Sequence, residues 1–469
     1  MFIGRERELT KLSELYQTNG FQFPVIYGRR RVGKTALINE FIKEKEAIFF
    51  TGIESSAQQN LENFSRSIAS YTGTELENTV FPSFQAALES VFELAEKKKI
   101  ILVIDEYPYV AKVSENFDSA LQLLIDKNKD NSNLFLLICG SSVAFMEQNV
   151  LAADAPLSGR STAQFKILPF DFFESRRFFK NFSDMDMATV YGIVGGIPHY
   201  LLQIDDNLSI EENIKRCLLD PSSPLFEEPD NIIKRGGRDT ALYNAVLTAM
   251  ATGSKRMSRI ASRVGERTSV CADYIEDLIL FDIVKKETPF AESFIRKTIY
   301  RIDDNLFRFW YWFVPDNIVS INRGLTDDVY KKIPPMLNDY MGDVFVKICI
   351  QYMWKLQEQG KIKTKFTDLG YWWGQHIRGK WAAEIDFMAA DGAKSVLFCD
   401  CQWTDEKVDV EVLDSFVKNS LRFYYKKKCQ HKKMQFYLFA KNGFAEECIE
   451  KAKELGNVTL VTFDEMLKV

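Results

Sequence analysis

The sequence predicts an α/β fold built on a parallel sheet, followed by a helical lid, a helical domain that ends in a hairpin, and a second α/β domain. Two observations predict the first fold. The octapeptide Gly28–Thr35 fits the pattern G-x-x-x-x-G-K-[ST] and follows a strand-like run, and the apolar runs 100–104 and 134–139 alternate with amphipathic stretches. Such runs are typical of parallel strands buried on both faces. A break at Pro334-Pro335, followed by a helix and a strand-rich block, predicts the second α/β domain.

The length and charge of the chain limit its organisation. A chain of 469 residues is too long for one ordinary hydrophobic core. We expect an α/β domain over 1–170, a lid over 171–237, a helical domain with its linker over 238–330, and a second α/β domain over 331–469. A hydrophobic share of 46% is typical of a folded soluble protein. The formal net charge of −5 gives no general affinity for nucleic acid, so any contact with DNA has to be local.

The cysteines, histidines and apolar runs indicate the compartment. Eight cysteines occur without C-x-x-C pairs, and three histidines lie far apart in the sequence, which argues against zinc and for reduced thiols. The amino-terminal residues are charged where a signal peptide needs an apolar core, and no apolar run reaches ~18 residues. We therefore expect a cytoplasmic protein that is neither secreted nor membrane-spanning.

The octapeptide predicts a phosphate cradle. Its glycines allow backbone N–H groups to close around phosphates, Lys34 can reach the β and γ oxygens, and the Thr35 hydroxyl can ligate Mg²⁺. The stretch 36–43 continues at helical spacing, so the cradle opens a helix whose amino end favours an anion. A chance match in a loop is the alternative. The candidate residues for ATP are Gly28, Arg29, Arg30, Arg31, Val32, Gly33, Lys34, Thr35 and Ala36.

The strand 100–104 ends in two carboxylates, as the second motif of a P-loop NTPase does. Asp105 is positioned to hold Mg²⁺ directly or through water, and Glu106 is positioned to polarise the water that attacks the γ-phosphate. The alternative is a solvated strand end, which many buried strands have.

The strand 134–139 is followed by Gly140-Ser141-Ser142. A hydroxyl at this point can lie between the acidic strand and the cradle, where Ser141 or Ser142 can contact the γ-phosphate or the lytic water. A plain Gly-Ser turn explains the same residues equally well.

Together with Phe2-Ile3-Gly4-Arg5-Glu6, these motifs resemble the archaeal-type ATPases of the STAND branch of AAA+-like NTPases. The resemblance implies ATP binding and hydrolysis with Mg²⁺, and it implies that Ile3, Gly4 and Arg5 lie near the adenine. It also implies that an arginine after Leu157-Ser158-Gly159 approaches the phosphates or a neighbouring subunit, which makes Arg160 a candidate. A surface arginine after a turn is the alternative. By the same resemblance, Pro198 sets a turn beside the base.

A different pattern begins at Asp239. Helices over 241–251, 256–264 and 269–280 precede strands at 283–287 and 296–301, which is the element order of a winged helix. Basic residues surround its second helix and the hairpin: Lys255, Arg256, Arg259, Arg263, Arg267, Lys285, Lys286, Arg296 and Lys297.

This basic set has two interpretations. One is binding of double-stranded DNA through its phosphates. The other is packing or partner binding, because Asp273, Glu276 and Asp277 on the third helix would repel phosphate. The aromatic run 306–314 is interpreted as core packing.

The carboxyl-terminal domain resembles the restriction-endonuclease-like domain that is fused to such ATPases. The resemblance rests on the runs 371–374, 382–389 and 395–403. A metal-dependent nuclease of this fold needs two acids and a lysine two residues after the second acid. The chain supplies Asp386 and Asp400 as a possible second metal site, but Gln402 stands at the lysine position.

A further acid is also missing from this domain. Val346 occupies the helical position where many relatives have one, although Asp343 or Glu384 could substitute. We therefore expect a nuclease fold with an incomplete site and a non-cleaving role. The basic run 426–433 is expected to be a solvated face.

The sequence thus predicts an ATPase whose nucleotide cycle drives a conformational change. We expect a DNA-associated ATPase, and the alternative is a STAND-type signalling switch whose carboxyl-terminal domains bind protein partners. A homo-oligomer is a further possible assembly.

Overall fold

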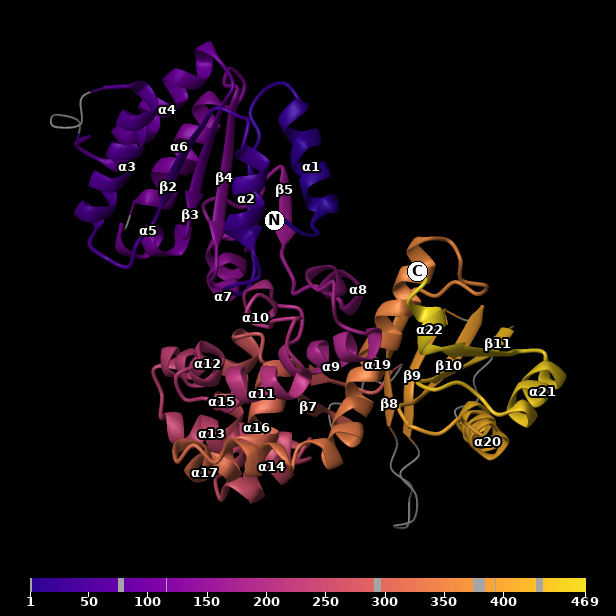
Figure 1. Ribbon diagram of the computed structural model, residues 1–469. Coiled ribbons are helices and arrows are strands. Elements are labelled where there is room, and N and C mark those ends of the chain that lie inside the picture. Colours follow the sequence, from indigo (N-terminus) through magenta and orange to yellow (C-terminus); the bar gives the residue numbers. More distant parts are fainter. Residues whose placement is uncertain are drawn as a thin grey trace. The chain divides into compact units, whose positions relative to one another are not determined.

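The computed structural model describes residues 2–74, 80–114, 116–290, 297–373, 384–392, 394–426 and 433–469. Within it the chain forms two compact units, Met1–Phe170 with Ile197–His199, and Asp171–Gly196 with Tyr200–Val469 (Figure 1). Some predicted features lie outside the described residues, namely Arg296, Gly374, the start of the predicted strand 382–389, the side chain of Glu384 and most of the basic run 426–433.

The first unit is built on a five-stranded sheet in the order β2-β3-β4-β1-β5, and every neighbouring pair is parallel. The strand β4 lies between β1 and β3, so the ends of the three strands that carry the predicted motifs are neighbours. The parallel α/β fold predicted from the sequence is confirmed. The strands are β1 (Pro24–Tyr27), β2 (Ala47–Thr51), β3 (Ile100–Asp105), β4 (Leu134–Gly140) and β5 (Ala163–Lys166).

Helices cover both faces of this sheet (Figure 1). One face of β3 and β4 packs into a core with α3, α4 and α6, whereas Phe135 on the other face contacts Tyr16 of α1 and Phe41 of α2. All residues of β3 and β4 are buried, as the apolar runs predict. The helices are α1 (Glu6–Gln17), α2 (Lys34–Ile42), α3 (Ala57–Thr72), α4 (Phe84–Lys97), α5 (Tyr107–Val113), α6 (Phe117–Asn128) and α7 (Val143–Phe145).

The second unit begins with helices. The three helices and the hairpin predicted after Asp239 are present, and the helix ends differ from the prediction by at most one residue. The elements are α8 (Phe172–Ser175), α9 (Asp184–Val194), α11 (Ile210–Leu218), α12 (Pro224–Ile233), α13 (Thr240–Ala251), α14 (Met257–Val264), α15 (Thr268–Leu280), β6 (Val284–Glu287) and β7 (Ile299–Ile302).

The aromatic run forms α16 (Asn305–Phe313), whose residues are buried except Trp312. This helix packs against α9 and α13, as expected for a core element. Two short helices, α17 (Ile318–Asn322) and α18 (Thr326–Tyr330), lead to the long helix α19 (Pro334–Glu358). The Tyr340 hydroxyl of α19 donates to the Gly192 carbonyl of α9 at 2.7 Å, which joins the helical part to the carboxyl-terminal part of this unit.

A second five-stranded sheet follows in the order β12-β11-β10-β9-β8. The strands β8, β9 and β10 are antiparallel, whereas β10, β11 and β12 are parallel, so the sheet is mixed. Its elements are β8 (Asp368–Trp373), β9 (Glu384–Asp391), β10 (Ser395–Gln402), α20 (Val410–Lys426), β11 (Lys433–Ala440), α21 (Glu446–Leu455), β12 (Val458–Thr462) and α22 (Phe463–Met466). No helix among the described residues is long and apolar enough to cross a membrane.

Candidate functional site

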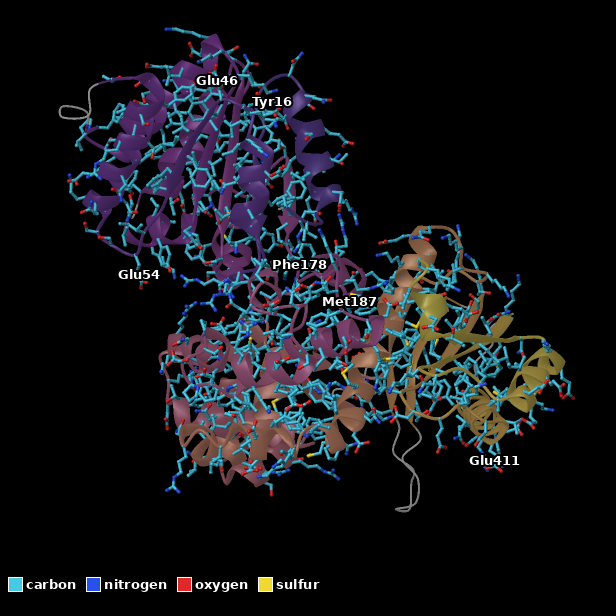
Figure 2. All side chains as sticks on the ribbon, viewed as in Figure 1. Tyr16, Glu46, Glu54, Phe178, Met187 and Glu411 are labelled. Atoms are coloured by element: carbon cyan, nitrogen blue, oxygen red, sulfur yellow. The ribbon has the colours of Figure 1, made fainter. Side chains whose placement is uncertain are left out.

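The predicted motifs meet at one edge of the first sheet. Because β1, β3 and β4 are parallel neighbours, the segments that follow their carboxyl ends lie side by side. Glu46 precedes β2 and Glu54 follows it, and Figure 2 shows these two side chains at opposite ends of the unit. Glu54 therefore marks the carboxyl edge, where the cradle lies, and Glu46 marks the amino edge.

The cradle has the backbone that its glycines predict. Gly28, Arg31 and Gly33 have φ of 153°, 71° and 91°, which favour glycine and are uncommon for arginine. A Cβ on Gly28 would lie 2.3 Å from the Ile167 carbonyl oxygen, so only glycine fits there. Val32 is fully buried, and the residue at the amino end of α2 is Gly33, which has no side chain to cap the helix. The first N–H groups of α2 therefore face the cradle, as an anion site requires.

Lys34 is buried under the loop that it belongs to. Its ammonium donates to the carbonyl oxygens of Gly28 at 2.8 Å and Arg29 at 2.9 Å. Burial lowers the pKa of the Lys34 amine, and the nearby carboxylates of Asp105 and Glu106 oppose that shift. The lysine is thus held in the cradle by neutral acceptors that an anionic ligand can replace.

Thr35, in the first turn of α2, and Asp105, the last residue of β3, are brought together. The Thr35 hydroxyl donates to Oδ2 of Asp105 at 2.9 Å, while Oδ1 of Asp105 accepts from the Glu106 amide at 2.9 Å. Thr35 and Ala36 are exposed, whereas Asp105 is only 4% exposed. Two hard oxygen ligands, of the type that Mg²⁺ prefers, therefore lie at the mouth of the cradle.

Glu106 and Ser141 form a second contact at this edge. Glu106 has φ of 50°, an uncommon value for a residue with a side chain, at the start of α5. The Ser141 hydroxyl donates to Oε2 of Glu106 at 2.7 Å. Of the two serines left open by the sequence, the structure thus brings Ser141 to Glu106.

Tyr109 also lies at this edge, although it belongs to none of the predicted motifs. The Arg30 Nε–H donates to Ser141 Oγ at 3.4 Å, and the Arg30 guanidinium also donates to the Tyr109 hydroxyl. Tyr109 lies one helical turn after Glu106 in α5. That spacing is the signal that could have indicated it.

The amino-terminal segment lies against the same loop. The Arg5 guanidinium donates to the carbonyl oxygens of Val32 at 3.2 Å and Leu168 at 2.5 Å, and it stacks over the Phe170 ring at 4.2 Å. Gly4 has φ of 72°, and a Cβ there would lie 2.7 Å from Phe170. Ile3, which precedes this turn, is half-buried.

Pro198 also lies close to the cradle, since its Cγ would be 3.6 Å from a Cβ on Gly33. The structure therefore brings Pro198, the first residue of the short helix α10 (Pro198–Leu201), and the amino-terminal segment to the loop that carries Lys34.

Arg160 is not brought to the cradle of its own chain. It forms two hydrogen bonds with Asp126, at 2.9 and 2.6 Å, and also donates to the carbonyls of Pro156 and Ser158. The nearby Thr162 amide donates to the carbonyl of Phe23, which precedes β1, whereas the cradle follows β1. Arg160 therefore lies at the amino edge of the sheet, so contact with its own nucleotide is not supported.

The acids of the second sheet have protein partners. Oδ2 of Asp386 accepts from the Cys401 amide at 2.7 Å, and Oδ2 of Asp400 accepts from Gln402 Nε2 at 2.7 Å. Burial raises the pKa of the Asp400 carboxyl, and the Gln402 hydrogen bond only partly offsets this. Among the described residues, no group of three or more His, Cys, Asp or Glu side chains is arranged to hold a metal ion.

Asp343, one of the two acids considered as substitutes, does not complete this site. Val346 is buried, and Asp343 pairs with Arg308 at 3.0 Å and Arg301 at 3.8 Å. Burial alone would raise the pKa of Asp343, but Arg308 and its other basic neighbours outweigh burial and lower it. Asp343 is therefore an ion-pair residue of the interface between the hairpin and α19.

The structure separates the predicted basic residues into arginines that are exposed and a hairpin lysine that forms an ion pair. Arg259, Arg263 and Arg267 are exposed around α14 and the start of α15. In contrast, Lys285 pairs with Asp303 at 2.6 Å. The end of the hairpin packs on β8, where the Phe290 amide donates to the Tyr371 carbonyl at 2.7 Å and Trp373 Nε1 donates to the Lys297 carbonyl at 3.0 Å.

Comparisons with known proteins agree with the fold of the first unit. Residues 2–204 match a family described as an ATPase domain predominantly from Archaea, and residues 310–413 match one described as archaeal and bacterial proteins of unknown function. An uncharacterized protein of Methanocaldococcus jannaschii is 32% identical over 434 residues, which are 91% of this chain and 92% of that protein. An uncharacterized ATP-binding protein of the same organism is 44% identical over 46 residues, 10% of this chain and 78% of that protein.

Among solved structures, the Walker-type ATPase of Pyrococcus abyssi superposes with a TM-score of 0.51 and 18% identity, over 66% of this chain and 96% of that chain. This similarity confirms the P-loop NTPase fold. The chain is therefore a nucleotide-binding ATPase and belongs to the family that is characterised by an ATPase domain predominantly from Archaea.

Proposed function

We propose that ATP binds at the carboxyl edge of the first sheet. The loop 28–33 and the amino end of α2 surround the phosphates, with Lys34 moving its ammonium from the loop carbonyls to the β and γ oxygens. The segment at Ile3, Gly4 and Arg5 and the turn at Pro198 border the base. The observation that carries this proposal is the buried Lys34 ammonium, whose two acceptors are neutral carbonyls of the cradle itself.

Thr35 and Asp105 are the residues that would hold Mg²⁺, directly or through water. When bound, the ion would neutralise part of the charge on the phosphates. Glu106 accepts a proton from the attacking water or orients that water, and Ser141 fixes the Glu106 carboxylate. Both side chains already lie within hydrogen-bond distance of each other, so the chain needs little rearrangement to present them.

We further propose that the second unit binds double-stranded DNA through α14 and the start of α15. The observation in favour is the exposure of three arginines there, Arg259, Arg263 and Arg267, with no ion pair found for them in the described part of the chain. The acids on α15 are partly neutralised, because Arg238 pairs with Asp277 at 2.8 Å and with Asp273 at 3.7 Å. The surface is therefore more basic than the sequence of α15 suggests.

Salt-dependent DNA binding tests this proposal. For the wild-type chain we expect affinity for duplex DNA to fall steeply with salt, and replacing the three arginines by alanine should reduce the slope of log K against log salt by about 2 to 3. A triple alanine variant at Lys361, Lys363 and Lys365, exposed residues before β8, removes the same charge elsewhere. Equal loss in both variants, or no binding at low salt, would exclude a DNA site at α14 and α15.

A second candidate function is a signalling switch that binds a protein partner. It is favoured by the packing of the hairpin end against β8, because that contact already uses the hairpin for protein packing. Stimulation of ATP hydrolysis by duplex DNA supports the first candidate. Hydrolysis that is unchanged by DNA, in a chain that binds none, supports the second. An action of Arg160 on a neighbouring subunit belongs to either candidate and requires a homo-oligomer.

We propose that the carboxyl-terminal domain does not cleave DNA. Asp386 and Asp400 each accept a hydrogen bond from the protein, and Gln402 can supply neither positive charge nor a base. Incubation of the chain with duplex DNA and Mg²⁺ or Mn²⁺ should leave the DNA intact. Cleavage that is lost in Asp400→Asn would contradict this proposal.

A further inference from the structure

A series of side-chain hydrogen bonds connects the segments that follow three strands at the candidate site. The Tyr109 hydroxyl accepts from the Arg30 guanidinium, the Arg30 Nε–H donates to Ser141 Oγ at 3.4 Å, and the Ser141 hydroxyl donates to Glu106 at 2.7 Å. The Tyr109 amide donates to the Glu106 carbonyl at 3.0 Å, so the series begins and ends in one turn of α5. The hydrogen bonds thus form a closed ring that includes Glu106.

The chemistry of this ring of hydrogen bonds fixes the direction in which the Ser141 hydroxyl proton points. A serine hydroxyl is a rotor with a single proton to donate and two lone pairs to accept with. The Arg30 N–H occupies a lone pair of Ser141 and directs the serine proton to the carboxylate. Without Arg30 in this place, the proton can turn toward other acceptors, including a phosphate oxygen.

Tyr109 has the role of an anchor for Arg30. In the described part of the chain, both hydrogen-bond partners of Arg30 are neutral hydroxyls, those of Ser141 and Tyr109, and Arg30 is half-buried. A guanidinium next to a phosphate site is drawn to the anion unless another contact holds it. The Tyr109 hydroxyl is the contact that can hold it over Ser141 while ATP occupies the cradle.

We propose that Tyr109 is a positioning residue for ATP hydrolysis: it anchors Arg30, which orients the Ser141 hydroxyl that fixes Glu106. The proposal rests on the function assigned above to Glu106 and Ser141. Tyr109 acts on the rate of the chemical step and not on the affinity for ATP.

The test is Tyr109→Phe, which removes one hydroxyl. We expect kcat to fall about tenfold, while KM and the dissociation constant for ATP change less than twofold. Tyr71→Phe is the matched control, because the Tyr71 hydroxyl donates to Glu46 at 2.6 Å and Glu46 marks the amino edge of the same unit. That variant should keep kcat within twofold.

A double-mutant cycle tests whether the effect of Tyr109 on kcat passes through Ser141. In the Ser141→Ala background, Tyr109→Phe should lower kcat by less than twofold further, because the effect passes through Ser141. Should Tyr109→Phe not fold, Arg30→Lys answers the same question, since lysine keeps the charge and lacks the fork that reaches both hydroxyls.

An unchanged kcat in Tyr109→Phe, a rise of KM with kcat unchanged, or fully additive losses in the cycle would overturn the inference. Lys34→Ala in the same assay distinguishes a failure of the ATP-site assignment from a failure of the positioning role of Tyr109. If Lys34→Ala still hydrolyses ATP, the site assignment itself is wrong. If only Tyr109→Phe is unaffected, the positioning role alone fails.

Discussion

The Thr35 hydroxyl lies 2.9 Å from Oδ2 of Asp105, although 70 residues separate them in the chain. The contact exists because β1 and β3 end at the same edge of the sheet with only β4 between them. A hydroxyl and a carboxylate at this distance can share one divalent cation. This pair therefore leads to a prediction about Mg²⁺.

Thr35→Ala should raise the Mg²⁺ concentration needed for half-maximal ATP hydrolysis by about tenfold or more, because one oxygen ligand is lost. Steady-state rates measured over a range of Mg²⁺ check this. Thr18→Ala removes a hydroxyl that donates to the Glu14 carbonyl and should leave the Mg²⁺ dependence unchanged. The same Mg²⁺ curve for Thr35→Ala and the wild type would show that Thr35 does not hold the ion.

Glu106→Gln should bind ATP with nearly unchanged affinity and hydrolyse it at least about 100-fold more slowly. The amide keeps the shape and can still accept from Ser141, but it cannot take a proton from water. Equilibrium binding and single-turnover hydrolysis measure the two effects. Glu54→Gln, an exposed carboxylate at the same edge of the sheet, is the control. Wild-type hydrolysis in Glu106→Gln would remove Glu106 from the mechanism.

Gly28→Ala should destabilise the first unit by about 3 kcal/mol, because the new Cβ would meet the Ile167 carbonyl oxygen at 2.3 Å and the residue has φ of 153°. In Gly159→Ala the added Cβ would meet no described residue beyond its chain neighbours within 4 Å, and only φ of 70° opposes it, so about 1 kcal/mol is expected. Chemical denaturation followed by fluorescence compares the two variants. Equal losses would show that the close approach at Gly28 does not set the cost.

Asp303 should make the second unit sensitive to acid. Its carboxylate pairs with Lys347 at 3.1 Å and Lys285 at 2.6 Å. Burial by itself would raise the pKa of Asp303, but the two ammonium groups outweigh it and hold the pKa well below its usual range. A depressed carboxyl pKa contributes stability above about pH 4, and that stability is lost as the pH falls further.

Asp303→Asn should therefore lower the free energy of unfolding at pH 7 by about 2 kcal/mol. The variant should also lose less stability than the wild type as the pH falls below about 4. The value is smaller than for a fully buried pair, because the Asp303 side chain is 31% exposed. Denaturation at several pH values measures both effects. Asp328→Asn breaks an exposed pair with Lys331 and should change the stability by less than about 0.5 kcal/mol. If Asp303→Asn lost stability with falling pH as the wild type does, Asp303 would not be the source of the acid sensitivity.

The sequence was sufficient for the parts of the site that follow from local patterns. The cradle, the carboxylates after β3 and the serine after β4 each adjoin a buried strand, and parallel strands bring such ends together by necessity. The helices α13, α14 and α15 were also predictable, because each has apolar residues at helical spacing and turns separate them.

The remaining features depend on contacts between distant residues. Arg160 was a reasonable candidate from its neighbours in the chain, but its ion pair with Asp126 lies at the other edge of the sheet. The spacing of Tyr109 from Glu106 makes it a candidate, but the contact with Arg30 that gives it a role is visible only in the structure. The basic hairpin likewise suggested an open surface, and only the structure shows Lys285 paired with Asp303.

The central claim is that the cradle around Lys34 binds and hydrolyses ATP, and the most direct measurement compares wild type with Lys34→Ala at saturating ATP and Mg²⁺. We predict that Lys34→Ala loses at least about 100-fold in hydrolysis or in affinity for ATP, because the β and γ oxygens lose their ammonium partner. Lys43→Ala, an exposed lysine just after the same helix, should behave as the wild type does. Wild-type hydrolysis and affinity in Lys34→Ala would contradict the account.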